Sequence, residues 1–257
     1  MDNQNTKIFK SVYSEFYDLV YENKNYEDEC NRIKDFLCYK KNIKDILELG
    51  CGTCGHSIIL SKNGYNIHAI DKSNEMLDIA SKKLKKEKIL NVKLFRDNIE
   101  DLKLKKYSYD VILLLFNVVG YIKNLSDFFS NIKMYLKKDS LIIFDFWHEV
   151  GVNFDGPKKI SKTFHKKNLE LIKKSSGSVN KKNRSVEIVI NTILKKQKKI
   201  ISQSSEKHSV RYYNLIFLNR IISSHGFEVI KFEDFKNSGD IPSKKNWSVY
   251  CICKFLG

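Results

Sequence analysis

Between Lys44 and Trp147, short apolar runs alternate with amphipathic stretches of helical length. The apolar runs lack the polar alternation of a sheet with one solvated face, so they predict parallel strands covered by helices on both sides. This pattern predicts a doubly wound α/β domain. The expected elements are strand 45–49, helix 55–62, strand 65–70, helix 74–84, strand 92–95, strand 109–116, helix 125–136 and strand 141–146.

The segments on either side of this region follow other patterns. Recurring aromatic and apolar positions predict two helices within residues 6–39. After Trp147, β-type runs such as Val186, Ile188 and Ile190 predict an antiparallel insertion over 158–213, broken by a turn-rich stretch at 173–184. A helix over 215–223 ends before Gly226, and strands over 227–235 and 247–255 are expected to rejoin the first sheet.

These patterns divide the chain into four expected parts. Residues 1–42 are expected to form helices that cap the ligand-binding site, and 43–150 are expected to form the core that holds this site. Residues 151–213 form the antiparallel insertion, expected to serve as a substrate lid or a dimer surface, and 214–257 complete the core sheet.

Composition adds a charge asymmetry to this picture. The 257 residues are 42% hydrophobic and 30% charged, which suits a folded chain with a real core, and the net charge is +16. Residues 156–200 hold 14 Lys or Arg against Glu170 and Glu187, so +12 of this charge lies in one segment. Such a segment either attracts phosphate groups or is a solvated surface in a lysine-rich protein.

No leader, membrane span or disulfide framework is expected. Residues 1–10 are polar, and the longest apolar runs, 111–116 and 141–147, are far too short to cross a bilayer, so the sequence predicts a cytoplasmic protein. The six cysteines lack the spacing of a disulfide framework and are expected to be reduced. Cys51 and Cys54 form a C-x-x-C pair, but without a second pair at matching spacing we expect no metal.

A glycine-rich turn follows the first strand of the core. Gly50, Gly52 and Gly55 satisfy the G-x-G-x-x-G pattern of dinucleotide-binding turns, and Asp71 lies where a ribose-binding carboxylate is expected. Glu48 decides between cofactors, because it would repel a pyrophosphate but attract the ammonium of S-adenosylmethionine. Residues 96–99 follow the third strand and are expected to meet the adenine.

With these residues the sequence resembles the class I S-adenosylmethionine-dependent methyltransferases. Glu-Leu-Gly-Cys-Gly-Thr at 48–53 is nearly identical to their first motif. Further segments resemble the N,N-dimethyltransferases of nucleotide-linked amino sugars and related methyltransferases of polysaccharide gene neighbourhoods: 17–21 (YDLVY), 116–121 (FNVVGY), 144–147 (FDFW), 206–212 (EKHSVRY) and 246–249 (NWSV). The resemblance implies a Rossmann-like, seven-stranded methyltransferase sheet with the antiparallel insertion after the fifth strand.

The resemblance also implies which residues bind S-adenosylmethionine and its product S-adenosylhomocysteine. Tyr17 and Glu48 flank the methionine end, and Phe116 and Asn117 lie beside the sulfonium. The other expected cofactor-binding residues are Gly50, Cys51, Gly52, Thr53, His56, Asp71, Lys72, Met76, Asp97, Asn98 and Ile99. The family usually has glycine where Cys54 stands, so the side chain of Cys54 is expected to reduce the room for the cofactor.

Methyl transfer is an in-line displacement, so the protein mainly supplies position and desolvation. A neutral amine acceptor needs little further help, whereas a hydroxyl acceptor needs a general base within about 3 Å of its proton. Tyr121 and His208 are the candidate catalytic residues. Tyr121, Trp147, His148 and Arg211 are the candidate substrate-binding residues.

The expected acceptor is a small anionic molecule, a nucleotide-linked amino sugar above all, and a homodimer is expected to be possible. RNA methylation through the lysine-rich insertion is the alternative, although the Asn-Pro-Pro-Tyr-like turn of adenine methylases is absent after the fourth strand. A nicotinamide-dependent oxidoreductase and a non-catalytic binding module also remain open. Whether nitrogen or oxygen is methylated, and how often, stays open as well.

Overall fold

The strands of the computed structural model form one continuous sheet, and the described residues are 12–104 and 108–257. Within them the sheet has eleven strands, with β3-β2-β1-β4-β5-β9-β8-β7-β6 as its main path. The core strands are β1 (Asp45–Leu49), β2 (Asn66–Asp71), β3 (Val92–Arg96), β4 (Tyr109–Leu114), β5 (Leu136–His148), β10 (Phe227–Asp234) and β11 (Ser248–Phe255). The insertion strands are β6 (Ile160–Lys166), β7 (Leu169–Asn180), β8 (Ser185–Lys196) and β9 (Lys199–Tyr213).

Seven of these strands form the predicted methyltransferase sheet. The strands β3, β2, β1, β4 and β5 pair in parallel, and β11 then pairs antiparallel with both β5 and β10. The prediction of a doubly wound α/β core with an insertion after the fifth strand is therefore confirmed.

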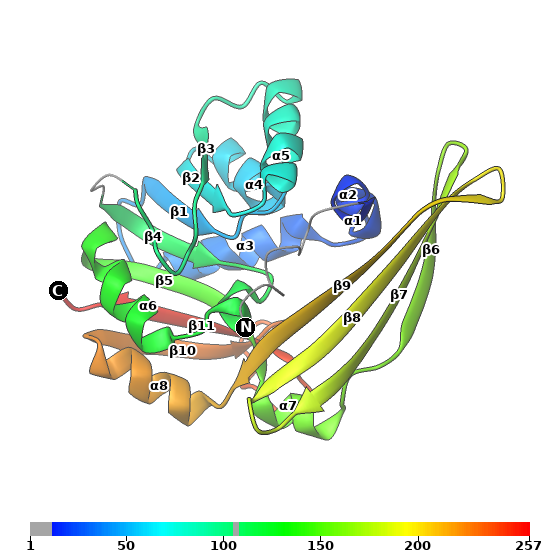
Figure 1. Ribbon diagram of the computed structural model, residues 1–257. Helices are drawn as coiled ribbons and strands as arrows, with labels where there is room; N and C mark the ends of the chain where they lie inside the picture. Colours follow the sequence, from blue (N-terminus) through cyan, green and yellow to red (C-terminus); the bar gives the residue numbers. More distant parts are fainter. Residues whose placement is uncertain (1–11, 105–107) are drawn as a thin grey trace.

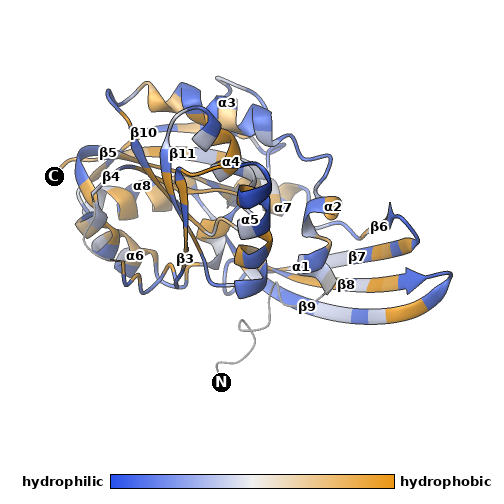
Figure 2. Cartoon of the chain, turned by 90° about the horizontal axis from the view of Figure 1, so that it is seen from above, coloured by the Kyte–Doolittle hydropathy of each residue, from blue (hydrophilic) through white to orange (hydrophobic). Residues whose placement is uncertain are grey.

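Helices cover both faces of the core sheet (Figure 1). Residues of α3 (Tyr26–Leu37), α4 (Gly55–Lys62) and α5 (Asn74–Lys86) pack on one face, and those of α6 (Leu125–Ile132) and α8 (Leu215–Ser224) pack on the other. The amphipathic spacing sets these contacts, as in α5, where Met76, Leu77, Ala80 and Leu84 are buried. Figure 2 shows hydrophobic colours concentrated on the core strands between these helices. No helix among the described residues is long and apolar enough to span a bilayer.

The insertion strands form an antiparallel extension that projects from the core as a curved wing (Figure 1). Its junction with the core is short, because β5 pairs with β9 only at Trp147–Tyr212 and His148–Tyr213. A short helix, α7 (Glu149–Phe154), lies in the connection between β5 and β6.

The N-terminal helices α1 (Val12–Glu15) and α2 (Tyr17–Val20) lie between α5 and the wing (Figure 1). Tyr13 and Tyr17 pack with Met76 of α5 and with Ile190 of β8. Phe16 packs against Leu171 and Leu194 of the insertion. These aromatic side chains therefore connect the core to the wing.

Several element boundaries differ from the sequence prediction. The turn-rich break expected at 173–184 is confirmed only at 181–184, where a turn joins β7 to β8. Over 173–180 it is wrong, because β7 continues to Asn180 and pairs with β8 throughout, so ladder hydrogen bonds outweigh its serines and glycine. The helix expected over 125–136 ends at Ile132, a 3-10 turn follows over Lys133–Tyr135, and β5 already begins at Leu136. The strand expected over 109–116 is β4, which ends at Leu114 rather than at Phe116.

The N-terminal segment and α7 also differ. Residues 12–37 contain three helices where the prediction over 6–39 gave two, and the expected start at 6–11 lies outside the described residues. The pattern did not predict α7, because its six residues, EVGVNF, are too few to show a helical period.

The buried glycine of α7 provides a test of this packing. A Cβ on Gly151 would meet the backbone oxygen of Asn246 at 2.0 Å, whereas a Cβ on Gly156 would meet nothing within 4 Å. We expect Gly151→Ala to lower the free energy of unfolding by about 1–3 kcal/mol, the usual cost of overpacking, while Gly156→Ala leaves it nearly unchanged. Urea denaturation of both variants measures this, and equal stabilities would contradict the packing described.

Candidate functional site

A cavity of about 540 Å³ lies at the carboxyl ends of β1, β2, β4 and β5. The core sheet, the N-terminal helices and the strands β8 and β9 of the insertion all contribute side chains to its lining. Ligands of open α/β sheets bind at this edge, because the loops after parallel strands converge there.

The glycine turn after β1 forms one wall of the cavity. The backbone N–H groups of Gly50 and Cys51 both donate to the carbonyl oxygen of Ile70 at 2.8 Å, which joins the turn to the end of β2. Gly52 has a φ of +54°, and a Cβ there would meet no protein atom within 4 Å, so its backbone faces open space.

Asp71 fixes this turn. Its Oδ2 accepts from the N–H of Gly52 at 2.9 Å, and its Oδ1 accepts from the N–H of Ser73 at 2.9 Å. Burial raises the pKa of Asp71, although these two N–H donors act in the opposite direction. The carboxylate therefore links the first two strand ends at the cavity wall.

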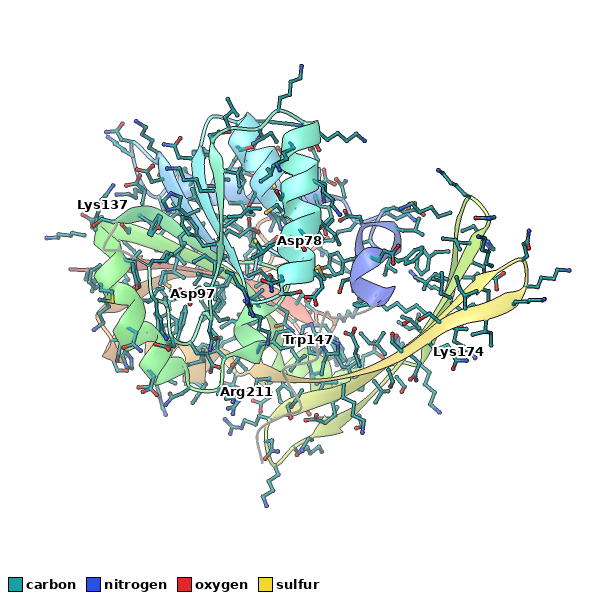
Figure 3. The ribbon with its side chains drawn as sticks, turned by 45° about the horizontal axis from the view of Figure 1, so that its top comes forward. Asp78, Asp97, Lys137, Trp147, Lys174 and Arg211 are labelled. Atoms are coloured by element: carbon teal, nitrogen blue, oxygen red, sulfur yellow. The ribbon has the colours of Figure 1, made fainter. Side chains whose placement is uncertain are left out.

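The structure brings every expected cofactor-binding residue to this one cavity. The residues concerned are Tyr17, Glu48, Gly50, Cys51, Gly52, Thr53, His56, Asp71, Lys72, Met76, Asp97, Asn98, Ile99, Phe116 and Asn117. Asp97 directly follows the end of β3 and is labelled in Figure 3. Their individual roles remain predictions.

Glu48 is part of a buried charge network rather than an isolated carboxylate. It accepts from the hydroxyl of Ser57, and its Oε1 lies 3.6 Å from Nδ1 of His56. Nε2 of His56 lies 2.8 Å from Glu29, which also accepts from Lys24.

The same network shifts two pKa values. Burial alone would lower the pKa of His56, but the carboxylates of Glu29 and Glu48 on its two sides raise it above its ordinary value. Burial alone would raise the pKa of Glu29, but His56 and Lys24 lower it overall. The buried His56 therefore lies between two acids that favour its protonated form.

A second wall comes from the turn after β4. Phe116 and Asn117 both have left-handed backbone angles, with φ of 66° and 58°. The N–H of Asn117 donates to Oδ2 of Asp145 at 2.9 Å, so a carboxylate at the end of β5 holds this strained turn.

Asp145 is a cavity residue that the sequence analysis did not select. Its side chain is buried, and burial together with the charge of Glu29 raises its pKa to about 7. The signal was available, since Asp145 is the one acid within the apolar run 141–147. Lys24 and Glu29 also line the cavity, but no pattern in the N-terminal helices marked them.

The two candidate catalytic residues contact each other. The hydroxyl of Tyr121 lies 2.9 Å from Nδ1 of His208, and both side chains line the cavity. Trp147 also lines the cavity, at the junction of core and wing visible in Figure 3.

The structure does not bring His148 and Arg211 to the cavity. Strand alternation explains both placements, because Trp147 faces the cavity while His148 next to it does not, and Arg211 lies on the exposed face of β9 (Figure 3). Val210 and His208 occupy the inner face of the same strand.

The charge of the cavity differs in sign from that of the whole chain. Among the described residues that line it, the acids outnumber the basic groups even though the pKa of Asp145 is about 7: Glu29, Glu48, Asp71, Asp97, Glu100 and Asp145 against Lys24, Lys72 and His56. Residues 156–200, all of them described, contribute only Ile188 and Ile190 to the lining. The basic segment therefore places no charged side chain in the lining itself, although Nζ of Lys173 donates to the hydroxyls of the lining residues Tyr13 and Tyr21 at 3.3 and 3.4 Å.

Cys54 does not occupy the cavity. Its backbone has a φ of 62° and its side chain is fully buried in the core cluster beneath the sheet, among residues of α3 and α4. The expectation that this side chain narrows the cofactor site is therefore wrong, because it points into the core. Among the described residues, no group of His, Cys, Asp or Glu side chains is arranged to hold a metal ion.

Comparison with known proteins agrees with this geometry. Residues 46–139 match the family model described as a methyltransferase domain. The fold is similar to that of an S-adenosylmethionine-dependent methyltransferase from Clostridium acetobutylicum, with a TM-score of 0.78, 17% identity and coverage of 95% of this chain and 97% of that one. It is also similar to the sugar N-methyltransferase KedS8 from Streptoalloteichus, with a TM-score of 0.77, 14% identity and coverage of 94% and 92%. The chain thus has the class I methyltransferase fold.

Sequence similarity to the curated proteins covers between 38% and 41% of this chain. The ribosomal protein L11 methyltransferase of Acetivibrio thermocellus is 33% identical over 107 residues, which are 40% of this chain and 32% of that protein. Overall the chain spans between 32% and 43% of the length of the curated relatives it matches.

The His56 network predicts a pH dependence of stability in the free protein. Since folding raises the pKa of His56, its contribution is fully present below the ordinary histidine value and is lost as pH rises through the higher folded value. We expect the protein to lose more stability between pH 6 and pH 9 than a His56→Gln variant does. Urea denaturation at both pH values measures this, with His165→Gln on the exposed face of β6 as the control. An equal loss of stability in the unaltered protein and in His56→Gln would contradict the network.

Proposed function

We propose that the protein is an S-adenosylmethionine-dependent methyltransferase that acts on a small molecule, an amino sugar in particular. The observation that carries this proposal is the wall formed by the glycine turn and Asp71, which opens onto a cavity at the strand ends of a class I methyltransferase fold. The cofactor supplies an electrophilic methyl group on a sulfonium, and the chain supplies binding, orientation and desolvation.

The cavity wall fits the parts of this cofactor. The carboxylate of Asp71 is placed to accept from ribose hydroxyls, and the open backbone at Gly52 permits close approach of a ligand. Asp97, Asn98 and Ile99 form the adenine side, with Met76 nearby. The methionine end belongs to Tyr17, Glu48 and the turn at Phe116–Asn117.

The charge of the cavity supports an amine acceptor. The excess of acids over basic groups favours cationic groups and disfavours phosphates in the low-dielectric interior. Aromatic side chains supply the remaining surface of the acceptor side, including Tyr13, Tyr21 and Trp147. An amino sugar satisfies both features, because its amine suits the acids and its ring faces stack on aromatic rings.

A nucleotide carrier group, where the sugar has one, would extend beyond the cavity. Outside the cavity, exposed lysines of the insertion such as Lys174 are the cations that would meet the phosphates of this carrier group (Figure 3). We propose that the insertion covers the acceptor side. The similarity in fold to a sugar N-methyltransferase supports this substrate class.

The competing functions fit the cavity less well. Six acids oppose the pyrophosphate of a nicotinamide cofactor and the phosphates of RNA, and the buried side chain of Cys54 leaves the cofactor site open. The lysine-rich insertion keeps RNA methylation as the alternative that an experiment must address.

The cofactor assignment is tested by calorimetry with S-adenosylhomocysteine. Asp71→Asn removes a charged acceptor at the turn, so we expect the affinity to fall by about 10- to 100-fold, as for the loss of hydrogen bonds to a charged group. Asp78→Asn, on the exposed side of α5, is the matched control and should bind like the unaltered protein (Figure 3). Unaltered protein that fails to bind S-adenosylhomocysteine would remove the proposal.

The acceptor class is tested by the release of S-adenosylhomocysteine from a panel of acceptors. The panel contains a free amino sugar, the same sugar linked to a nucleoside diphosphate, the parent sugar with a hydroxyl in place of the amine, and an RNA oligonucleotide. We expect turnover with the amino sugars and only background with RNA, because the cavity is acidic. Turnover with RNA alone would favour the alternative function.

A further inference from the structure

Three side chains form a connected line that leads from the cavity into the insertion. The hydroxyl of Tyr121 lies 2.9 Å from Nδ1 of His208, and Oε2 of Glu206 lies 3.4 Å from Nε2 of the same ring. Tyr121 and His208 line the cavity, whereas Glu206 lies behind them and is only 6% exposed. The imidazole is therefore held between a phenol on the cavity side and a carboxylate on the far side.

The local structure explains how these residues meet. Glu206 and His208 are two positions apart on β9, so they share one face of the strand. Tyr121 comes from the 3-10 turn Val118–Tyr121, whose Gly120 lies directly against β9. A Cβ on Gly120 would meet Cγ1 of Val210 at 2.7 Å, so only glycine lets this turn approach β9 closely enough for the contact.

The carboxylate of Glu206, 3.4 Å from Nε2, favours the tautomer of His208 that carries its hydrogen on Nε2. In that tautomer Nδ1 carries no hydrogen and accepts from the hydroxyl of Tyr121. Burial raises the pKa of Tyr121, with smaller contributions from Tyr21 and Glu206. The phenol therefore stays protonated and serves as a conduit for a proton.

We propose that Tyr121, His208 and Glu206 form a proton relay that removes the proton from the acceptor nucleophile, with Glu206 as a positioning residue. This inference rests on the proposed methyltransferase function. One proton moves from the acceptor nitrogen or oxygen to the oxygen of Tyr121, while the phenolic proton moves to Nδ1 of His208. The freed lone pair forms the bond to the methyl carbon, whose bond to sulfur breaks with its electrons going to sulfur.

The surroundings of the relay determine its charge balance. Tyr13, Tyr17 and Tyr21 line the same cavity as Tyr121, and Glu206 is the carboxylate whose charge raises the pKa of Tyr121. After the transfer, the imidazolium of His208 lies beside the carboxylate of Glu206, so the proton is stabilised until solvent removes it.

The first test needs no acceptor and no cofactor. Nitrogen-15 NMR of histidine-labelled protein reports the tautomer of His208, assigned with a His208→Gln variant. We expect the Nε2–H tautomer in the unaltered protein, and a shift toward a mixture of tautomers in Glu206→Gln. Glu228→Gln, whose side chain is 59% exposed on β10, is the control and should leave the signal unchanged. An Nδ1–H tautomer in the unaltered protein, or no change in Glu206→Gln, would overturn the relay.

The second test follows methyl transfer to the amino sugar against pH. We expect Glu206→Gln to lower kcat by about 100-fold near pH 6, the lower end of general acid–base effects, with KM little changed. The loss should shrink as pH rises and the acceptor loses its proton to solvent. Tyr121→Phe should behave alike, and the double variant should be no worse than either single one.

The outcomes separate the relay from the function on which it rests. A uniform loss of kcat at all pH values in Glu206→Gln would reduce the residue to a structural role and overturn the relay. Failure of the unaltered protein to bind S-adenosylhomocysteine would instead remove the proposed function. Since the NMR test uses the free protein, it decides for or against the relay even where the acceptor is a different small molecule.

Discussion

The pairing of β5 is the constraint on which the rest of the structure depends. One edge of this strand pairs with β11 along Leu141–Trp147, and the other pairs first with β4, up to Phe144, and then, from Trp147, with β9. This change of partner joins the core sheet to the insertion and leaves the end of β5 at the cavity. Asp145 and Trp147 reach the cavity from that end, and Asp145 also holds the turn after β4.

Charge is separated in this protein between its surface and its cavity. The chain carries +16, yet six acids line the described cavity against two lysines and His56. The lysines of the insertion remain outside, while buried hydrogen bonds and His56 compensate the acids within. Net charge therefore says little here about the ligand, because a low-dielectric cavity responds to its own lining far more than to distant, screened surface charge.

The core and its cofactor wall could be predicted from the sequence, because they depend on local signals. Apolar runs locate the core strands, and Gly50, Gly52 and Asp71 mark the turn at their ends. The course of β7 could not be predicted, since Ser175 to Ser178 resemble a turn and become a strand only through their pairing with β8, and at Ser175 also with β6. Arg211 was placed wrongly at the acceptor, although the alternation of Val210 and Tyr212 around it already indicated the outer face. Asp145 was missed because its role depends on the turn after β4, which is distant in sequence.

The pairing of β5 with β11 also affects the order in which the protein can fold as it is synthesised. The hairpins of the insertion pair neighbouring segments, so they can form as soon as they emerge from the ribosome. By contrast, the edge of β5 at Leu141–Trp147 pairs with Lys254–Ser248, about 100 residues later. Until that last strand arrives, an apolar strand edge is unprotected, and a nascent chain in this state is open to aggregation or to capture by chaperones.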